Sequence, residues 1–598
     1  MTNHMYTMIK RGDAVLQSGV GSVIRTRHGL TGIVAGLPEW EMTLRRAFPD
    51  DEDYLDYIRK NSIRDPELEA ATGVSSFLVP PRFDDDRGSR NWIIPLIRFP
   101  MAGWCQNWQC GRVSIAHQGD KHAALWKCPH CAKGKSFSRV QQVPVFLICP
   151  NGHIEEIDWS QSVVHNGGCT SDNIKLSLGG AIQQPVPKCL DCGGRSEGGF
   201  TKKCSGRRIW LPEKEVEDCS EEMELIERTS VTVYFPSMKS ALHIPSEAEV
   251  DDRIVEFIRN RPNLLRRVCD TNTDSPKELE VVAEQLNDEG FSIDLDGMKT
   301  HVAHIRALEA ESAADQWNVY EARLNEFDVL SGRKTYPRLL NNPLFTIETK
   351  DLLRYNHPLI GHDSLIRGVS AVHVLTETRV LDGFSRKNPR SVGRREGHQL
   401  LWGTEVVRQH WLPAYRVRGE GIFFEINPDV LANVPSERRI GVDGRPTVVD
   451  LSDRGVIAHT LAHILARELS LDSGYALPSI RDRIYDLDDE RLGFLLYTAE
   501  GDSMGTMGGV VRFAQSGILE GLLDRMLESV AWCPQDPVCI ESVLDSDRRI
   551  AGACHQCCLV PETSCELFNQ YLDRSALIGS ESGRISPVLG EFLFGQTH

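Results

Sequence analysis

The sequence predicts a multidomain α+β protein, with a zinc-ribbon-rich N-terminal half, an acidic helical middle and a C-terminal α/β zinc-binding domain. The chain has 598 residues, which is too long for a single hydrophobic core. Its 17 cysteines gather almost entirely in two blocks, 105–219 and 533–565, and apolar residues at helical spacing lie between them. We therefore expect five regions: a β-rich region at 1–100, zinc ribbons at 101–245, acidic helices at 246–335, a mixed α/β region with a basic loop at 336–450, and a zinc-binding domain at 451–598.

The composition is that of an ordinary globular protein, with 41% hydrophobic and 25% charged residues. No apolar run approaches the roughly 18 residues that cross a bilayer. The first residues, MTNHMYTMIKRGDAV, lack the apolar segment of a secretory signal, so we expect a cytoplasmic protein without a membrane partner. Disulfides are disfavoured in that compartment, and CxxC pairs there indicate metal sites or redox motifs.

The net charge of −17 is unevenly distributed. Between Glu213 and Asp328 there are 28 acidic and 12 basic residues, a balance of −16. The rest of the chain is therefore close to neutral, and a local patch that binds nucleic acid is compatible with the composition.

Local patterns place several elements. Gly turns flanking Val23-Ile24 and Thr31–Val34 predict a β-hairpin. Residues 246–330 carry apolar residues at near-helical spacing, which favours an acidic helical insert with a solvated outer face over a protein-interaction element. Strands are expected at 421–427 and 492–498, and Ser452 or Asp453 is suited to cap a helix.

The glycine-rich stretch Gly501–Gly509 follows the second of these strands. We interpret it as a tight turn rather than a phosphate cradle, because it lacks the Lys-Ser/Thr of a P-loop and the GxGxxG order. The sequence contains no Walker A motif, so we do not expect the chain to hydrolyse ATP by itself.

The most specific metal signal is Cys105-x4-Cys110 followed by Cys128-x2-Cys131. Two such knuckles about 17 residues apart have the spacing of a four-cysteine zinc ribbon. Because four thiolates leave zinc no open position, this site is expected to build structure rather than to perform chemistry.

The next donors leave the grouping open. They are Cys149, His153, His165, Cys169, Cys189, Cys192, Cys204 and Cys219. One partition gives the two sites Cys149/His153/His165/Cys169 and Cys189/Cys192/Cys204/Cys219. A second partition shares Cys149 or Cys169 with the knuckle at Cys189 and leaves both histidines structural.

The C-terminal block offers six thiols for what we expect to be one ion. Cys554 and Cys557 form one half of the site, Cys565 is a third ligand, and the fourth is Cys539 or Cys533. Cys558 cannot easily point to the same ion as its neighbour. Over the whole chain we expect two to four structural Zn²⁺ ions and no catalytic residue.

His459 and His463 lie four residues apart on one predicted helical face, as in a metalloprotease helix. Thr460 stands where the HExxH motif has its glutamate, which favours buried histidines with fixed hydrogen bonds. The alternative function is a metal-dependent nuclease or hydrolase that uses both histidines with acids such as Asp502.

One basic segment is a candidate for nucleic-acid binding. Its charged residues are Arg379, Arg386, Lys387, Arg390, Arg394 and Arg395, opposed by few acids. Proline and glycine predict a loop, which either contacts phosphates or is merely solvated.

The C-terminal part of the chain contains the motifs His459-Thr-Leu-Ala-His-Ile-Leu-Ala-Arg467, Ser473-Gly-Tyr-Ala, Arg481-Asp-Arg-Ile-Tyr485, Leu495-Leu-Tyr-Thr-Ala-Glu-Gly-Asp-Ser, Gly505-Thr-Met-Gly-Gly, Ala553-Cys-His-Gln-Cys-Cys-Leu, Thr563-Ser-Cys565 and Asn569-Gln-Tyr-Leu-Asp-Arg574. As a set, these motifs resemble the zinc-binding domain shared by DrmB proteins and Mrf-type helicases. The extra thiol of Cys558 departs from the family pattern.

Further motifs upstream are Gly36-Leu-Pro-Glu-Trp40, Gly383-Phe-Ser-Arg, Trp411-Leu-Pro and Gly419-Glu-Gly421. They resemble the DrmB subunit of the bacterial DISARM anti-phage system. The resemblance implies a non-ATPase accessory subunit that forms a heterodimer with a separate helicase, DrmA, and helps it to bind phage DNA in anti-phage defence.

Overall fold

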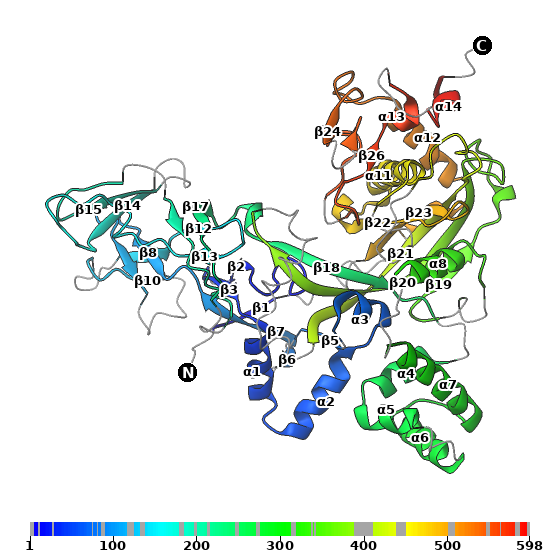
Figure 1. Ribbon diagram of the computed structural model, residues 1–598, viewed down its shortest axis with the longest axis horizontal. Coiled ribbons are helices and arrows are strands. Elements are labelled where there is room, and N and C mark those ends of the chain that lie inside the picture. Colours follow the sequence, from blue (N-terminus) through cyan, green and yellow to red (C-terminus); the bar gives the residue numbers. More distant parts are fainter. Residues whose placement is uncertain are drawn as a thin grey trace. The chain divides into compact units, whose positions relative to one another are not determined.

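The computed structural model describes most of the chain. The described residues are 5–9, 12–26, 29–74, 76–80, 82–84, 90–116, 125–131, 138–178, 185–196, 200–211, 216–245, 250–270, 276–312, 319–335, 339, 342–387, 411–437, 450–499, 509–545, 550–561, 564–580 and 587–594. They mix helices and strands, as the predicted α+β class requires. The chain divides into two compact units, a first unit of Met1–Lys239 with Arg379–Tyr415 and a second unit of Ser240–Thr378 with Arg416–His598 (Figure 1).

The first unit begins with an antiparallel sheet and three helices. The sheet has the order β1-β7-β3-β2, with β6 paired to β7. The predicted hairpin is confirmed, because β2 and β3 pair antiparallel with Val23 opposite Ile33. The bounds are β1 Met5–Met8, β2 Val23–Arg25, β3 Thr31–Val34, α1 Leu37–Ala47, α2 Asp51–Asn61, β4 Ser62–Ile63, α3 Pro66–Thr72, β5 Ser76–Leu78, β6 Arg82–Asp84 and β7 Arg90–Arg98.

The cysteine-rich part of the first unit consists of short strands in three small sheets. Their orders are β10-β11-β8-β9, β13-β12-β17-β16 and β14-β15. The bounds are β8 Ala102–Cys105, β9 Val113–Ile115, β10 Leu125–Lys127, β11 Arg139–Gln142, β12 Val145–Ile148, β13 Ile154–Glu155, β14 Ile174–Leu178, β15 Pro185–Cys189, β16 Lys202–Lys203 and β17 Glu222–Glu227. Sheets this small bury little apolar surface, so additional cross-links are needed to hold them.

The second unit is built on a mainly antiparallel sheet. In it β21 pairs with β23, which forms a hairpin with β22, and β19 pairs with β20. Both predicted strands are confirmed within β21 and β23. The bounds are β18 Phe235–Leu242, β19 Thr346–Thr349, β20 Ile366–Ser385, β21 Trp411–Ile426, β22 Ile480–Asp486 and β23 Leu492–Ala499.

A long helix, α11 (Asp453–Ser473), covers β22 and β23 (Figure 1). The predicted cap is Ser452, whose hydroxyl accepts a hydrogen bond from the Gly455 amide at 3.1 Å. The helix is buried along most of its length, in an extended apolar core. A helix with apolar residues on every side is stable only when neighbours surround it.

The remaining C-terminal elements include a three-stranded sheet of order β24-β25-β26, and both α12 and β26 contact α11. Their bounds are α12 Leu519–Ala531, β24 Val543–Asp545, β25 Ile550–Ala551, β26 Leu572–Asp573, α13 Ser575–Ile578 and α14 Gly590–Phe594. Within the described part of the chain, no helix combines the length and the apolarity needed to cross a membrane.

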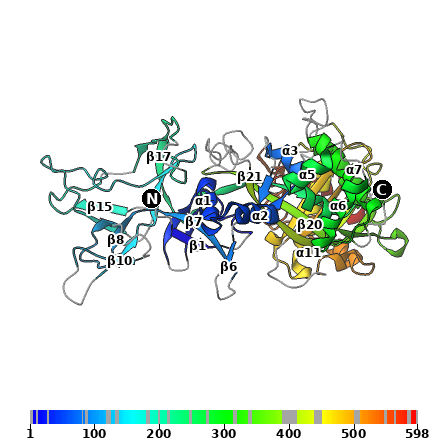
Figure 2. The ribbon, with the colours of Figure 1, turned by 90° about the horizontal axis from the view of Figure 1, so that it is seen from below.

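The acidic stretch is helical, as expected. The helices α4, α5, α6 and α7 share one apolar core, and the last three lie side by side in both views (Figures 1 and 2). The bounds are α4 Asp252–Arg259, α5 Pro262–Cys269, α6 Pro276–Asp288, α7 Leu295–Ser312 and α8 Val319–Leu330.

The last of these helices, α8, differs from the prediction that the acidic face of this stretch is solvated. Glu326 is buried on it and accepts two hydrogen bonds from the Arg483 guanidinium, at 2.5 and 2.8 Å, and one from the Tyr485 hydroxyl at 2.9 Å. Asp328 pairs with Arg491 at 2.8 Å. The acids of α8 therefore fasten it to the β22–β23 hairpin instead of facing water.

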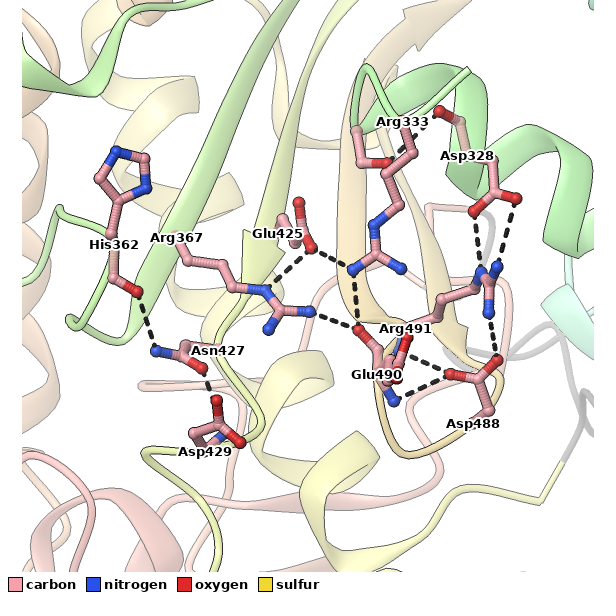
Figure 3. Close-up of polar contacts among 11 residues, drawn as sticks. Asp328, Arg333, His362, Arg367, Glu425, Asn427, Asp429, Asp488, Glu490 and Arg491 are labelled. Atoms are coloured by element: carbon pink, nitrogen blue, oxygen red, sulfur yellow. Dashed lines mark hydrogen bonds and ion pairs between the residues drawn. The ribbon is translucent and has the colours of Figure 1, made fainter.

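Figure 3 shows this network continuing onto the sheet. Glu425 accepts hydrogen bonds from Arg333 at 2.8 Å and from Arg367 at 2.9 Å. Arg491 also pairs with Asp488 at 2.7 Å. Oppositely charged groups from the helix, the hairpin and β20–β21 thus neutralise one another around the edge of the core.

The pair formed by Glu326 and Arg483 gives a first prediction. Replacing Glu326 with glutamine removes the charge that compensates a guanidinium exposed to only 2%. Loss of one partner of a buried pair costs about 3 to 5 kcal/mol, so the second unit should unfold at clearly lower urea concentration, measured by limited proteolysis along a urea gradient. The matched control is Asp296→Asn, which breaks the exposed pair with Lys299 and should leave the midpoint unchanged. Equal midpoints for both variants would contradict the role given to the buried pair.

Candidate metal centres

The described residues hold five groups of four donors, and the donor atoms of each group lie within 4.8 Å of one another. All 17 cysteines are free thiols rather than disulfides. Thiolates that bind one zinc ion at 2.3 Å in a tetrahedron lie about 3.8 Å apart. Four of the groups are rich in cysteine and can be compared directly with that geometry.

The first group is Cys105, Cys110, Cys128 and Cys131, the predicted four-cysteine ribbon. Its Sγ–Sγ distances are 3.7 Å for Cys105–Cys131 and 3.9 Å for Cys110–Cys128, close to the tetrahedral value. One knuckle follows β8 and the other follows β10, so the sheet that joins these strands brings the two pairs together.

The second group is Cys149, His153, Cys204 and Cys219. His153 Nδ1 lies 3.4 Å from Cys149 Sγ, while its Nε2 lies 3.1 Å from the Glu217 carboxylate, which Arg208 holds at 2.9 Å. A ring that donates from Nε2 turns the lone pair of Nδ1 toward the sulfurs, as metal-binding histidines do. Burial lowers the pKa of His153, which favours the neutral ring that binds metal.

The third group is His165, Cys169, Cys189 and Cys192. His165 Nε2 lies 3.0 Å from the Ser160 carbonyl oxygen, and its Nδ1 lies 3.4 Å from Cys192 Sγ. Backbone amides of Asn166 and Gly194 lower the pKa of Cys192 to about 6, so this thiol is a thiolate at neutral pH. The group is therefore suited to a metal ion in the same way as the second.

The first partition expected from the sequence differs from these groups, and the second agrees with them only in placing Cys169 with the knuckle at Cys189. Cys149 and His153 join Cys204 and Cys219, whereas His165 and Cys169 join Cys189 and Cys192. Strand pairing is the reason. β12 pairs with β17 and β17 with β16, which places the turn after β12 beside the residues that follow β16 and precede β17. β14 pairs with β15, with Ile174 opposite Cys189, and this hairpin carries the third group.

The fourth group is Cys533, Cys539, Cys554 and Cys557. The Sγ–Sγ distances are 3.6 Å for Cys533–Cys554, 3.7 Å for Cys539–Cys557 and 3.8 Å for Cys554–Cys557. A hydrogen bond from Cys558, with the nearby positive charge of Arg574, lowers the pKa of Cys557 to about 4. These four thiols match a closed tetrahedral site.

The composition of this group corrects the sequence-based expectation. Cys533 and Cys539 both take part, so they are not alternatives, and Cys565 belongs to a different group. A buried arginine explains how Cys533 and Cys539 come together. The Arg574 guanidinium binds Asp536, and Asp536 accepts hydrogen bonds from the Cys533 amide at 2.9 Å and the Ile540 amide at 3.2 Å. Cys558 lies outside the group, as its adjacency to Cys557 predicted.

The fifth group consists of His459, His463, Asp482 and Cys565. Sequence reasoning found the two histidines but missed Asp482, which is an inward-facing carboxylate in a strand whose burial is nearly continuous. His459 and His463 are exposed to 0% and 1%, which favours a structural role over the hydrolase alternative. Asp502, the acid named for that alternative, and most of the Gly501–Gly509 turn lie outside the described residues.

The structure places the residues of the predicted basic loop in different surroundings. Arg386 is 1% exposed, and its guanidinium donates to the carbonyl oxygens of Gly152, at 2.7 Å, and Gly21. It also lies 4.7 Å from the ring centres of Trp210 and Phe384, so it is an internal brace rather than a phosphate contact.

The other residues of this basic segment have different positions. Arg379 is also buried, where it donates to the Tyr415 hydroxyl at 3.2 Å. Lys387 forms an ion pair with Glu224 at 2.8 Å. Arg390, Arg394 and Arg395 lie outside the described residues.

A comparison with curated proteins covers nearly the whole chain. The DISARM protein DrmB of Bacillus paralicheniformis is 26% identical over 552 residues, which are 86% of this chain and 93% of that protein. The chain is therefore similar to DrmB over most of its length. Residues 10–235 also match a domain of unknown function, DUF8724, and this stretch contains the first three metal groups.

In the sequence of the first unit, the third metal group lies between residues of the second group, and this arrangement gives a second prediction. Cys149 and Cys204 share one group, so Cys149→Ser, Cys204→Ser and the double variant should each bind one metal ion fewer than the unaltered chain. The double variant Cys149→Ser/Cys169→Ser should bind two fewer. Native mass spectrometry of the full chain counts the ions.

Cys269→Ser is the control, because Cys269 lies in α5 and belongs to none of the five groups. Its ion count should equal that of the unaltered chain. Loss of one ion from Cys149→Ser/Cys169→Ser and of two from Cys149→Ser/Cys204→Ser would instead support the partition into Cys149/His153/His165/Cys169 and Cys189/Cys192/Cys204/Cys219.

Proposed function

We propose that this protein is a non-ATPase accessory subunit of a DISARM anti-phage system, which forms a cytoplasmic complex with the helicase subunit DrmA and helps it to bind phage DNA. The observation that carries the proposal is the similarity to the DISARM protein DrmB over 86% of this chain. The C-terminal motifs named above further suggest a zinc-binding domain of the type that Mrf-type helicases carry.

The four cysteine-rich groups are assigned to structural zinc. Each provides four protein donors at separations that suit a tetrahedral ion, and such a set leaves no position for water or substrate. Chemistry at these ions would require an open position. Their proposed role is to hold short strands and turns in a fixed binding surface.

ATP hydrolysis is assigned to DrmA, because the sequence of this chain contains no Walker A motif. An accessory subunit can still raise DNA affinity by adding phosphate contacts beside the helicase. Such contacts supply a sequence-independent attraction that weakens with salt.

The proposed DNA contacts are Arg390, Arg394 and Arg395. Arg386, which the sequence grouped with them, is held inside the first unit by backbone carbonyls, so it is left out of the proposal. Lys387 is paired with Glu224 and would have to exchange that partner for a phosphate.

Complex formation is the direct test of the proposed role, and a third prediction. The tagged full chain, co-expressed with DrmA, should retain DrmA through affinity purification and elute with it in size-exclusion chromatography. An unrelated helicase of similar size serves as the control and should not be retained. A chain that elutes alone beside DrmA would refute the accessory role.

A fourth prediction concerns DNA. Replacing Arg390, Arg394 and Arg395 with alanine should weaken the binding of duplex DNA by the DrmA complex. The slope of log K against log salt concentration should become shallower by about 2 to 3, since each lost phosphate contact removes roughly 0.9. Fluorescence anisotropy at several salt concentrations measures both quantities.

The matched control removes the same three charges elsewhere. Arg266, Lys277 and Lys299 are exposed on α5, α6 and α7, and their replacement with alanine should leave affinity and slope unchanged. Equal effects of the two triple variants would show that net charge, rather than the 390–395 segment, governs DNA binding.

A further inference from the structure

Four donor atoms converge in the interior of the second unit. His463 Nε2 lies 2.9 Å from Asp482 Oδ2, and His459 Nε2 lies 3.3 Å from the same oxygen and 3.2 Å from Cys565 Sγ. The exposed fractions of the four residues are between 0% and 6%. The two histidines are neighbours on α11, the carboxylate lies on β22, and the thiol precedes the turn that leads to β26.

The outer nitrogens of both rings fix their orientation. His459 Nδ1 lies 3.1 Å from the Tyr571 carbonyl oxygen, and His463 Nδ1 lies 2.9 Å from the Cys558 carbonyl oxygen. Because a carbonyl oxygen can only accept, each Nδ1 carries the hydrogen. A neutral ring then directs the lone pair of Nε2 at the Asp482 carboxylate, which is also an acceptor. Acceptors facing one another at 2.9 to 3.3 Å need either a hydrogen or a metal ion between them.

The other two donors are prepared in the same way. The Glu566 amide donates to Asp482 Oδ1 at 2.7 Å, which leaves Oδ2 for the shared centre. Cys565 Sγ accepts the Leu567 and Asn569 amides, both at 3.3 Å, and amide donors to sulfur stabilise a thiolate. Every donor of the group is thus oriented by a contact outside it, which is the pattern of metal ligands.

The backbone of the turn after Cys565 adopts a strained conformation that makes these contacts possible. Phe568, Asn569 and Tyr571 have φ of 53°, 58° and 60°, in the left-handed region that residues with a side chain rarely adopt. Asn569 is held there by hydrogen bonds between its side chain and the backbone of Val560, at 3.0 and 2.8 Å. The strained turn supplies one amide to Cys565 and the carbonyl of Tyr571 to His459. Strain of this kind persists where the surroundings over-determine it, commonly at a bound ligand.

We propose that His459, His463, Asp482 and Cys565 bind one divalent transition-metal ion, for which the donor set of two nitrogens, one oxygen and one sulfur selects zinc. All four positions of a tetrahedral ion are filled by protein, so the site is closed and structural. With one carboxylate and one thiolate, a divalent ion makes the buried group neutral overall. The ion joins α11 to β22 and to the turn after Cys565. This site is separate from the four cysteine-rich groups and does not depend on the proposed partnership with DrmA.

The alternative arrangement is a hydrogen-bonded cluster without metal. It would need hydrogens in place of the ion, one on Asp482 or on a ring nitrogen between His463 and Asp482, and the S–H of Cys565 pointing toward His459 Nε2. Asp482→Asn separates the two arrangements, because an amide keeps the size of the carboxylate but is a poor metal ligand. In a metal-free cluster the amide N–H groups would satisfy the ring nitrogens, and no ion would be lost.

The test is metal content of the full chain, purified without chelators, by native mass spectrometry and elemental analysis. His463→Gln and Asp482→Asn should each bind one zinc ion fewer than the unaltered chain. The double variant Cys554→Ser/His463→Gln should bind two fewer, because Cys554 belongs to the fourth group. His357→Gln is the matched control: this buried ring accepts the Leu359 amide at 3.1 Å, and its count should not change.

Equal ion counts for the unaltered chain, His463→Gln and Asp482→Asn would overturn the proposal. Should both variants fail to fold, the unaltered chain decides by itself. Five zinc ions per chain support the fifth site, and four or fewer contradict it.

Discussion

The convergence of four donor atoms at each of five points is the constraint on which the rest of this structure depends. Donor atoms within about 4 Å of one another require the turns that carry them to meet, even when long segments separate them in sequence. The second group joins Cys149 to Cys219 around the whole hairpin that carries the third group. Strands of two to six residues bury too little apolar surface to enforce such meetings alone. Ions bound at these groups would supply the folding free energy that a larger core would otherwise provide.

The same constraint explains why polar groups surround the donors. His153, His165, His459 and His463 each place one ring nitrogen against an acceptor and the other toward the metal group. Three of these acceptors are backbone carbonyls and one is the Glu217 carboxylate. Each ring is fixed before an ion arrives, so binding does not have to immobilise it. This preparation distinguishes the groups from histidines and cysteines that merely share a core.

Short-range features of the fold could be predicted because short-range physics determines them. The hairpin at Val23–Val34, the cap at Ser452 and the knuckle pairs follow from turn residues, capping hydroxyls and two-residue spacing. The grouping of the donors could not, because it depends on which strands pair across tens of residues. Asp482 escaped notice for a related reason: one acid in a strand looks like a surface residue until the opposite face is known to be covered. Cys565 was assigned to the cysteines nearest to it in sequence because the packing of the strands cannot be predicted from local patterns.

Buried arginines show why a count of basic residues misjudges the surface of this protein. Arg386, Arg483 and Arg574 are among the largest fully buried side chains, and each is held by protein acceptors. Two of them also brace metal groups: Arg386 holds the carbonyl of Gly152, inside the turn between Cys149 and His153, and Arg574 holds Asp536 beside Cys533. A turn that loses its ion is free to move that carbonyl away, which would leave the guanidinium buried with fewer acceptors. Because an unpaired buried cation is strongly unfavourable, a bound ion and the arginine would stabilise the turn as one cooperative unit.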